Sequence, residues 1–141
     1  CLLISIASFG QQGIIKENQK VKSSILGEEM AYNVYLPANY DKTNQKYPIL
    51  YLLHGYTDDE TGWTQFGEAQ YIADKTINSG DAPAMIIVMP DADSTFYINN
   101  FSGTEKYEDY FVKELIPHIE STYRVRSKKE FRAVAGLSMG R

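Results

Sequence analysis

The sequence has 141 residues, 43% of them hydrophobic and 23% charged, which is an ordinary globular composition with enough apolar residues for one hydrophobic core. The net charge is −4 and no basic stripe runs along the chain, which argues against nucleic-acid binding because phosphate contacts require clustered Lys and Arg. One cysteine, Cys1, and two histidines allow neither a disulfide framework nor a cysteine- or histidine-rich metal site, so we expect no metal and no cofactor.

The first ten residues indicate export. They lack an initiator Met and form an apolar run that ends on Ser8-Phe9-Gly10, where small residues flank a large one, as at the end of a secretory signal peptide. The run is too short for a stable membrane span. A lipid-anchored Cys1 or a buried first strand are the alternatives. We therefore expect a signal-peptide remnant at residues 1–10, cleavage after Gly10, and a secreted or periplasmic protein.

Strand patterns open the remaining segment, residues 11–141, which we expect to be the N-terminal part of a single domain. Residues 21–26 form a plausible strand, and residues 30–36 alternate apolar and polar positions as a half-exposed strand does. Residues 27–29 suit a hairpin turn between them. Residues 48–53 are an unbroken apolar run, which predicts a parallel strand buried on both faces.

The pattern then alternates between helix and strand. Residues 63–77 have helical spacing, and residues 84–89 form a second buried strand that ends at Pro90. A polar, aromatic-rich loop follows up to Gly103. Residues 106–123 predict an amphipathic helix in which Pro117 should cause a kink or a loosened turn, and residues 131–135 are a third short strand.

Two antiparallel strands followed by this alternation predict an α/β fold with a mostly parallel central sheet between helices and with right-handed crossovers. In such sheets ligands bind beyond the carboxyl ends of the strands. The chemical candidates below all lie at those ends.

The sharpest signal is Gly136-Leu137-Ser138-Met139-Gly140, which matches G-x-S-x-G after a strand. The turn from strand to helix must be tight, so the serine takes a strained backbone conformation and the flanking glycines, Gly136 and Gly140, avoid Cβ clashes. The motif predicts an α/β-hydrolase nucleophile elbow, with Ser138 as nucleophile and the Met139 amide as one oxyanion donor.

A second constellation lies at Leu53-His54-Gly55-Tyr56, where an apolar strand ends in His-Gly. Gly55 lets the backbone turn so that the Tyr56 amide becomes the second oxyanion donor. His54 precedes the serine, whereas this fold orders its triad as serine, acid and histidine, so we predict a structural role for His54 rather than a role as base. His118 lies on a helix and is not a candidate base either. Residues expected to line the pocket are His54, Thr57, Trp63, Asp91 and Tyr97.

Taken together, these motifs resemble the putative-esterase family that includes esterase D, feruloyl esterases and acetyl xylan esterases. The resemblance covers residues 30–141 and rests on residues 33–37, 40–41, 47–55, 62–63, 88–91, 114–120, 123 and 135–140. It implies that Ser138 is the nucleophile, that Tyr56 and Met139 supply the oxyanion amides, and that the triad acid and base lie downstream of Arg141. The chain is therefore expected to be an N-terminal fragment.

The resulting hypothesis is a serine carboxylic-ester hydrolase that forms an acyl-enzyme on Ser138. Resemblance and export together imply acyl or feruloyl esters of plant cell-wall carbohydrate as substrates, either small or polymeric. An S-formylglutathione-type thioesterase and a non-catalytic, carbohydrate-binding relative are the alternatives. The sequence leaves the oligomeric state open.

Overall fold

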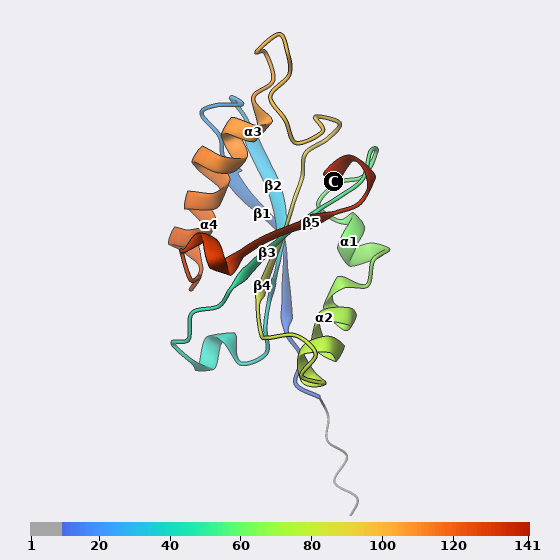
Figure 1. Ribbon diagram of the computed structural model, residues 1–141, viewed down its shortest axis with the longest axis vertical. Coiled ribbons are helices and arrows are strands. Elements are labelled where there is room, and N and C mark those ends of the chain that lie inside the picture. The colour runs from blue at the N-terminus through green and yellow to red at the C-terminus, as the bar shows by residue number, and fades with distance from the viewer. Residues whose placement is uncertain (1–9) are drawn as a thin grey trace, which may run out of the picture.

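The computed structural model describes residues 10–141, which form a five-stranded mixed sheet with helices on both faces (Figure 1). Residues 1–9, which carry most of the expected signal peptide, lie outside the described residues. The strands are β1 (Ile14–Lys22), β2 (Glu29–Leu36), β3 (Ile49–Leu53), β4 (Ile86–Pro90) and β5 (Arg132–Gly136). Their order in the sheet is β1-β2-β4-β3-β5. β1 and β2 pair antiparallel, as do β2 and β4, whereas β3 runs parallel to both β4 and β5.

The helices between the parallel strands divide over the two faces of the sheet. α1 (Gly62–Gln65) and α2 (Ala69–Asn78) cover one face, while α3 (Tyr107–Tyr110), the π-helical turn η2 (Phe111–Leu115) and α4 (Ile116–Thr122) cover the other (Figure 1). Short 3₁₀ turns are η1 (Tyr40–Lys42), η3 (Lys129–Phe131) and η4 (Ser138–Gly140). Within residues 10–141, no helix is both long and apolar enough to cross a membrane.

A hydrophobic core lies on each side of the sheet. The larger cluster joins alternate β2 residues such as Tyr32 and Val34 to Leu115 and Ile119 of the α3–α4 layer. The smaller cluster joins Tyr35, whose side chain points the other way, to the α2 face. This alternation confirms the predicted strand at residues 30–36, but the strand is buried on both faces rather than half exposed.

The prediction of a first strand at residues 21–26 is wrong in its position. β1 begins at Ile14, and residues 23–28 form a turn closed by the Ser23 N–H and the Glu28 carbonyl at 2.8 Å. β1 is a largely exposed strand paired only with β2, so most of its side chains need not be apolar. Its polar sequence therefore carries no strand periodicity, and backbone pairing alone defines it.

Both predicted helices are interrupted. The first breaks at Gly67 and Glu68, where Glu68 has a left-handed φ of 47° and a Cβ on Gly67 would lie 2.7 Å from the Trp63 ring. The second contains the π-helical turn η2 directly before the turn that holds Pro117, which agrees with the loosened turn expected there.

The carboxyl ends of β3, β4 and β5 lie at the same edge of the sheet because these strands are parallel. β5 pairs with β3 from Arg132 to Gly136 and is the outermost strand on that side of the described sheet. In this edge position, Val134 is 59% exposed. The three loops that follow these strands meet at this edge and form the candidate site.

Candidate active site

The turn after β5 has the strained geometry expected of a nucleophile elbow. The Leu137 N–H donates to the Leu53 carbonyl at 3.2 Å, which extends the β3–β5 ladder by one bond, and the chain then turns into η4. Ser138 has φ 52°, a left-handed value that non-glycine residues adopt at a cost of about 1–3 kcal/mol. Its side chain is exposed, whereas that of Met139 is buried beneath it. The elbow therefore presents the serine hydroxyl to solvent at the sheet edge.

Two glycines permit this turn. A Cβ on Gly136 would lie 2.3 Å from the Gly140 carbonyl oxygen, and a Cβ on Gly140 would lie 2.6 Å from the Leu53 Cβ. Both distances are far below van der Waals contact. These contacts account for glycine at both positions, and they show that β3 as well as the elbow itself limits the space.

The loop after β3 lies directly against the elbow. A Cβ built on Gly55 would be 3.8 Å from the Ser138 Cβ. Residues 55–58 form a β-turn in which the Asp58 N–H donates to the Gly55 carbonyl at 3.2 Å. Thr57, the third residue, has φ 68°, the pattern of a type II turn, which usually has Gly at that position.

Two backbone amides next to the serine are free. Among the described residues, neither the Tyr56 N–H nor the Met139 N–H makes a hydrogen bond, although their neighbours Asp58 and Gly140 do. Free amides on two loops that meet at an exposed serine have the composition of an oxyanion hole. The arrangement is suited to stabilising negative charge on a carbonyl oxygen under attack.

The His54 side chain is buried and fully occupied. It is 1% exposed, its Nδ1 lies 2.8 Å from the Gly55 carbonyl oxygen, and its Nε2 accepts the Ala92 N–H at 3.0 Å. Because the carbonyl can only accept and the amide can only donate, these contacts assign the proton to Nδ1. Neither ring nitrogen is free to take a proton from Ser138, which supports the structural role expected for His54.

His118 is also engaged away from the elbow, on α4. Its Nε2 lies 3.2 Å from the Tyr32 hydroxyl, and burial lowers its pKa below the usual histidine value. Within residues 10–141, both histidine side chains are thus engaged away from Ser138, and neither is placed to act as its general base.

The loop after β4 carries two adjacent aromatic residues, of which Tyr97 packs inward and Phe96 is exposed. Tyr97 was expected to line the pocket, but its hydroxyl is bonded to the backbone of His54 and burial raises its pKa well above the normal range. Phe96, its neighbour, is 55% exposed instead and lies 6.1 Å, centroid to centroid, from the 58% exposed ring of Tyr56. The sequence did not distinguish these adjacent rings, because both occur in an irregular loop.

The other residues expected to line the pocket lie in three different places. Trp63 lines an apolar cavity of about 200 Å³ beside the elbow, together with Gly55, Asp58, Gly62, Phe66, Gly67 and Leu137. Thr57 is exposed at the top of its turn and does not line this cavity. Asp91 is half-buried at the end of β4, with its carboxylate 3.7 Å from His54 Nε2. Leu137 also lines this cavity and is not among the residues predicted to do so, although it lies inside the serine motif.

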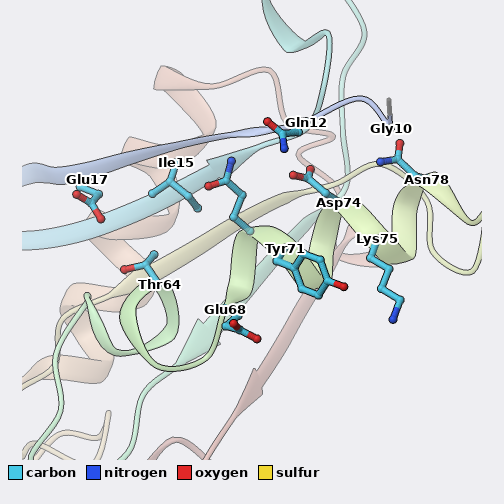
Figure 2. A pocket seen from close by; sticks show the side chains of 11 residues that line it. Gly10, Gln12, Ile15, Glu17, Thr64, Glu68, Tyr71, Asp74, Lys75 and Asn78 are labelled. Atoms are coloured by element: carbon cyan, nitrogen blue, oxygen red, sulfur yellow. The ribbon is translucent and has the colours of Figure 1, made fainter. Parts of the chain in front are cut away.

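A separate cavity of about 680 Å³ lies between β1 and α2 (Figure 2). Tyr71, Asp74 and Lys75 of α2 line one side and Ile15 and Glu17 of β1 the other. None of the residues expected at the active site lines it, so it is not part of this site.

Comparisons with known proteins identify relatives of the chain. A family model described as "Putative esterase" matches residues 23–140. An endo-1,4-beta-xylanase/feruloyl esterase of Xylanibacter ruminicola is 36% identical over 126 residues, which are 84% of this chain and 17% of that protein.

Solved structures show the same fold. The structure of a ferulic acid esterase superimposes with a TM-score of 0.85 at 36% identity, covering 92% of this chain and 51% of the other. A ferulic acid esterase of Anaeromyces mucronatus in complex with ferulic acid gives a TM-score of 0.77 at 26% identity, covering 97% and 53%. The chain thus spans about half the length of these structures and a smaller share of the xylanase.

Proposed function

This chain belongs to the Putative esterase family, and on that premise we propose that it is the N-terminal part of a serine carboxylic-ester hydrolase of the α/β-hydrolase fold whose nucleophile is Ser138. One observation carries the proposal. Ser138 is exposed on a left-handed turn, and two unpaired amides, those of Tyr56 and Met139, lie on the loops that meet there.

The chemistry follows from this arrangement. The Ser138 Oγ attacks the ester carbonyl carbon, and the carbonyl oxygen gains negative charge as the tetrahedral intermediate forms. The Tyr56 and Met139 N–H groups donate to that oxygen, each contributing about 3 kcal/mol in comparable enzymes. The alcohol leaves, and water then releases the acid from the acyl-enzyme. We place the base and its acid partner in a segment outside this chain, because His54 and His118 are both engaged.

The substrate proposed is an acyl or feruloyl ester of plant cell-wall carbohydrate. Relatives described as feruloyl or ferulic acid esterases support this class. The exposed rings of Tyr56 and Phe96 and the apolar cavity at Trp63 offer surfaces on which an aromatic acyl group or a sugar ring can pack. Export as a secreted or periplasmic enzyme suits such a polymeric substrate.

The decisive test is Ser138→Ala in a protein that continues past Arg141. We expect hydrolysis of p-nitrophenyl acetate and of a feruloyl arabinoside to fall by about a million-fold with the thermal melt retained. Ser121→Ala, an exposed serine on α4, is the matched control and should keep full activity. Activity of the Ser138 variant within tenfold of the wild type would refute the assignment. Faster turnover of S-formylglutathione than of either ester would favour the thioesterase alternative.

A further inference from the structure

The Tyr97 hydroxyl takes the place of a strand partner at the end of β3. It accepts the His54 N–H at 2.8 Å and donates to the His54 carbonyl at 3.3 Å. The register between β3 and β4 ends at Tyr51 and Val88, so the His54 backbone lies beyond that ladder. A side chain from the loop after β4 therefore holds the backbone from which the Gly55 turn begins.

Tyr97 is itself held firmly. Its ring packs edge-on against the rings of His54 and Tyr107, with centroids 5.6 and 5.3 Å apart. The Tyr107 hydroxyl donates to the Asp91 carbonyl at 2.7 Å, which ties the start of the same loop to α3. Tyr97 and Phe96 have φ values of 58° and 56°, and a left-handed backbone at two successive bulky residues persists only where the surroundings enforce it.

The His54 side chain extends this hold to the next peptide. Its Nδ1–H donates to the Gly55 carbonyl, and its Nε2 is fixed by the Ala92 N–H. The Gly55 carbonyl and the Tyr56 N–H belong to one planar trans peptide and point in opposite directions. Drawing the carbonyl toward the buried His54 ring therefore turns the Tyr56 N–H away from it. The Gly55 carbonyl also accepts the Asp58 N–H at 3.2 Å, so the His54 ring and the turn hold this peptide together.

We propose that Tyr97 is a positioning residue for catalysis, which sets the direction of the Tyr56 oxyanion amide through His54. The inference rests on the proposed esterase function and concerns a residue that does not itself touch the substrate. It follows that the loop after β4 influences the rate of the chemical step and not only the shape of the pocket. Oxyanion donors act on the transition state more than on the bound ester, so the effect falls on kcat.

The test is Tyr97→Phe, which removes only the hydroxyl, in the same extended protein. Tyr35→Phe is the matched control, because the Tyr35 hydroxyl is also part-buried and donates to Asp74 at 2.7 Å, on α2, outside the site. For Tyr97→Phe we expect kcat to fall by about tenfold to a hundredfold with KM within twofold. The affinity for an arylboronic acid, which forms a tetrahedral adduct with serine, should fall by the same factor. Tyr35→Phe should lower the melting temperature without changing kcat, KM or the affinity for the boronic acid.

Equal kcat and equal boronic-acid affinity in Tyr97→Phe and the wild type would overturn the proposal. A rise in KM alone would also overturn it, since that would mean that Tyr97 contacts the ester.

If Tyr97→Phe does not fold, the pair His54→Asn and His54→Ala decides. The Asn amide can still donate to the Gly55 carbonyl, so His54→Asn should retain a higher kcat than His54→Ala at similar KM. An equal loss of kcat in both variants would refute the role of His54 in positioning the Tyr56 amide. Failure of the esterase assignment is recognised separately, by activity that survives in Ser138→Ala.

Discussion

Gly136→Ala gives the most direct test of how the elbow is built. The added methyl group would lie 2.3 Å from the Gly140 carbonyl oxygen, 2.8 Å from the Gly140 carbonyl carbon and 3.0 Å from the Leu53 Cβ. Ordinary contact begins at 3.4 Å, so the Gly140 carbonyl must move by about 1 Å. The two nearest atoms belong to the backbone and the Leu53 Cβ is attached directly to it, so none of the three can rotate away as the end of a side chain can.

The displacement has two measurable consequences. Overpacking of this kind costs about 1–3 kcal/mol of stability. The shift also moves η4, which carries the Met139 amide and follows directly from Ser138, and a misplacement of about 1 Å in a reacting group costs about a hundredfold in rate. We therefore expect kcat for p-nitrophenyl acetate to fall by about two orders of magnitude in Gly136→Ala.

A glycine elsewhere separates the two consequences. Gly27 has φ 77° and nothing within 4 Å of a built Cβ, so Gly27→Ala introduces backbone strain of about 1–2 kcal/mol far from the elbow. It should lower the melting temperature and leave kcat and KM unchanged. Thermal melts and steady-state kinetics on both variants are sufficient. Wild-type kcat in Gly136→Ala would refute the reasoning, and so would an equal loss of kcat in Gly27→Ala.

Two further predictions concern stability. Burial lowers the pKa of His118, so the unfolded chain binds more protons than the folded one, and stability should decline as pH falls below about 6.5. His118→Gln should flatten the dependence of melting temperature on pH between 5 and 8, and an unchanged slope would contradict this. Glu114 accepts the Ser23 hydroxyl and the N–H groups of Ser24 and Ile25, at 2.9 and 3.2 Å for the two amides. Glu114→Ala should cost about 2 kcal/mol, or about 4–8 °C in melting temperature, which calorimetry would measure, and a loss below 1 °C would show that the turn holds without it.

The candidate site was predictable where its geometry is local. The Gly-x-Ser-x-Gly spacing predicts a tight turn, and the structure has that turn, with Ser138 at φ 52°. The space at Gly136 is limited within the motif by the Gly140 carbonyl, whereas the space at Gly140 is limited by Leu53 of β3. The His-Gly pair after the apolar strand likewise marked the loop that lies against the elbow. The exclusion of His54 as base rested on chain order, and the buried ring with both nitrogens engaged supports it.

The elements that were misplaced leave no mark in the apolar pattern. β1 is polar and is defined by its pairing with β2, and the helix break falls at Gly67, where a Cβ would clash with Trp63 one turn earlier. Neither feature produces a hydrophobic period, which is the signal on which strand and helix prediction depends.

By itself, the sequence determined the α/β class through its apolar periodicity, and the family through the motifs that it shares with it. Only the tertiary structure decided which side chains serve the site. Tyr97 turns inward to His54, 43 residues away, while Phe96 stays exposed beside Tyr56, and the His54 ring is fixed by an amide 38 residues along the chain. The choice between two adjacent aromatic residues depends on which backbone groups the folded sheet leaves unpaired at its edge, and no local pattern contains that information.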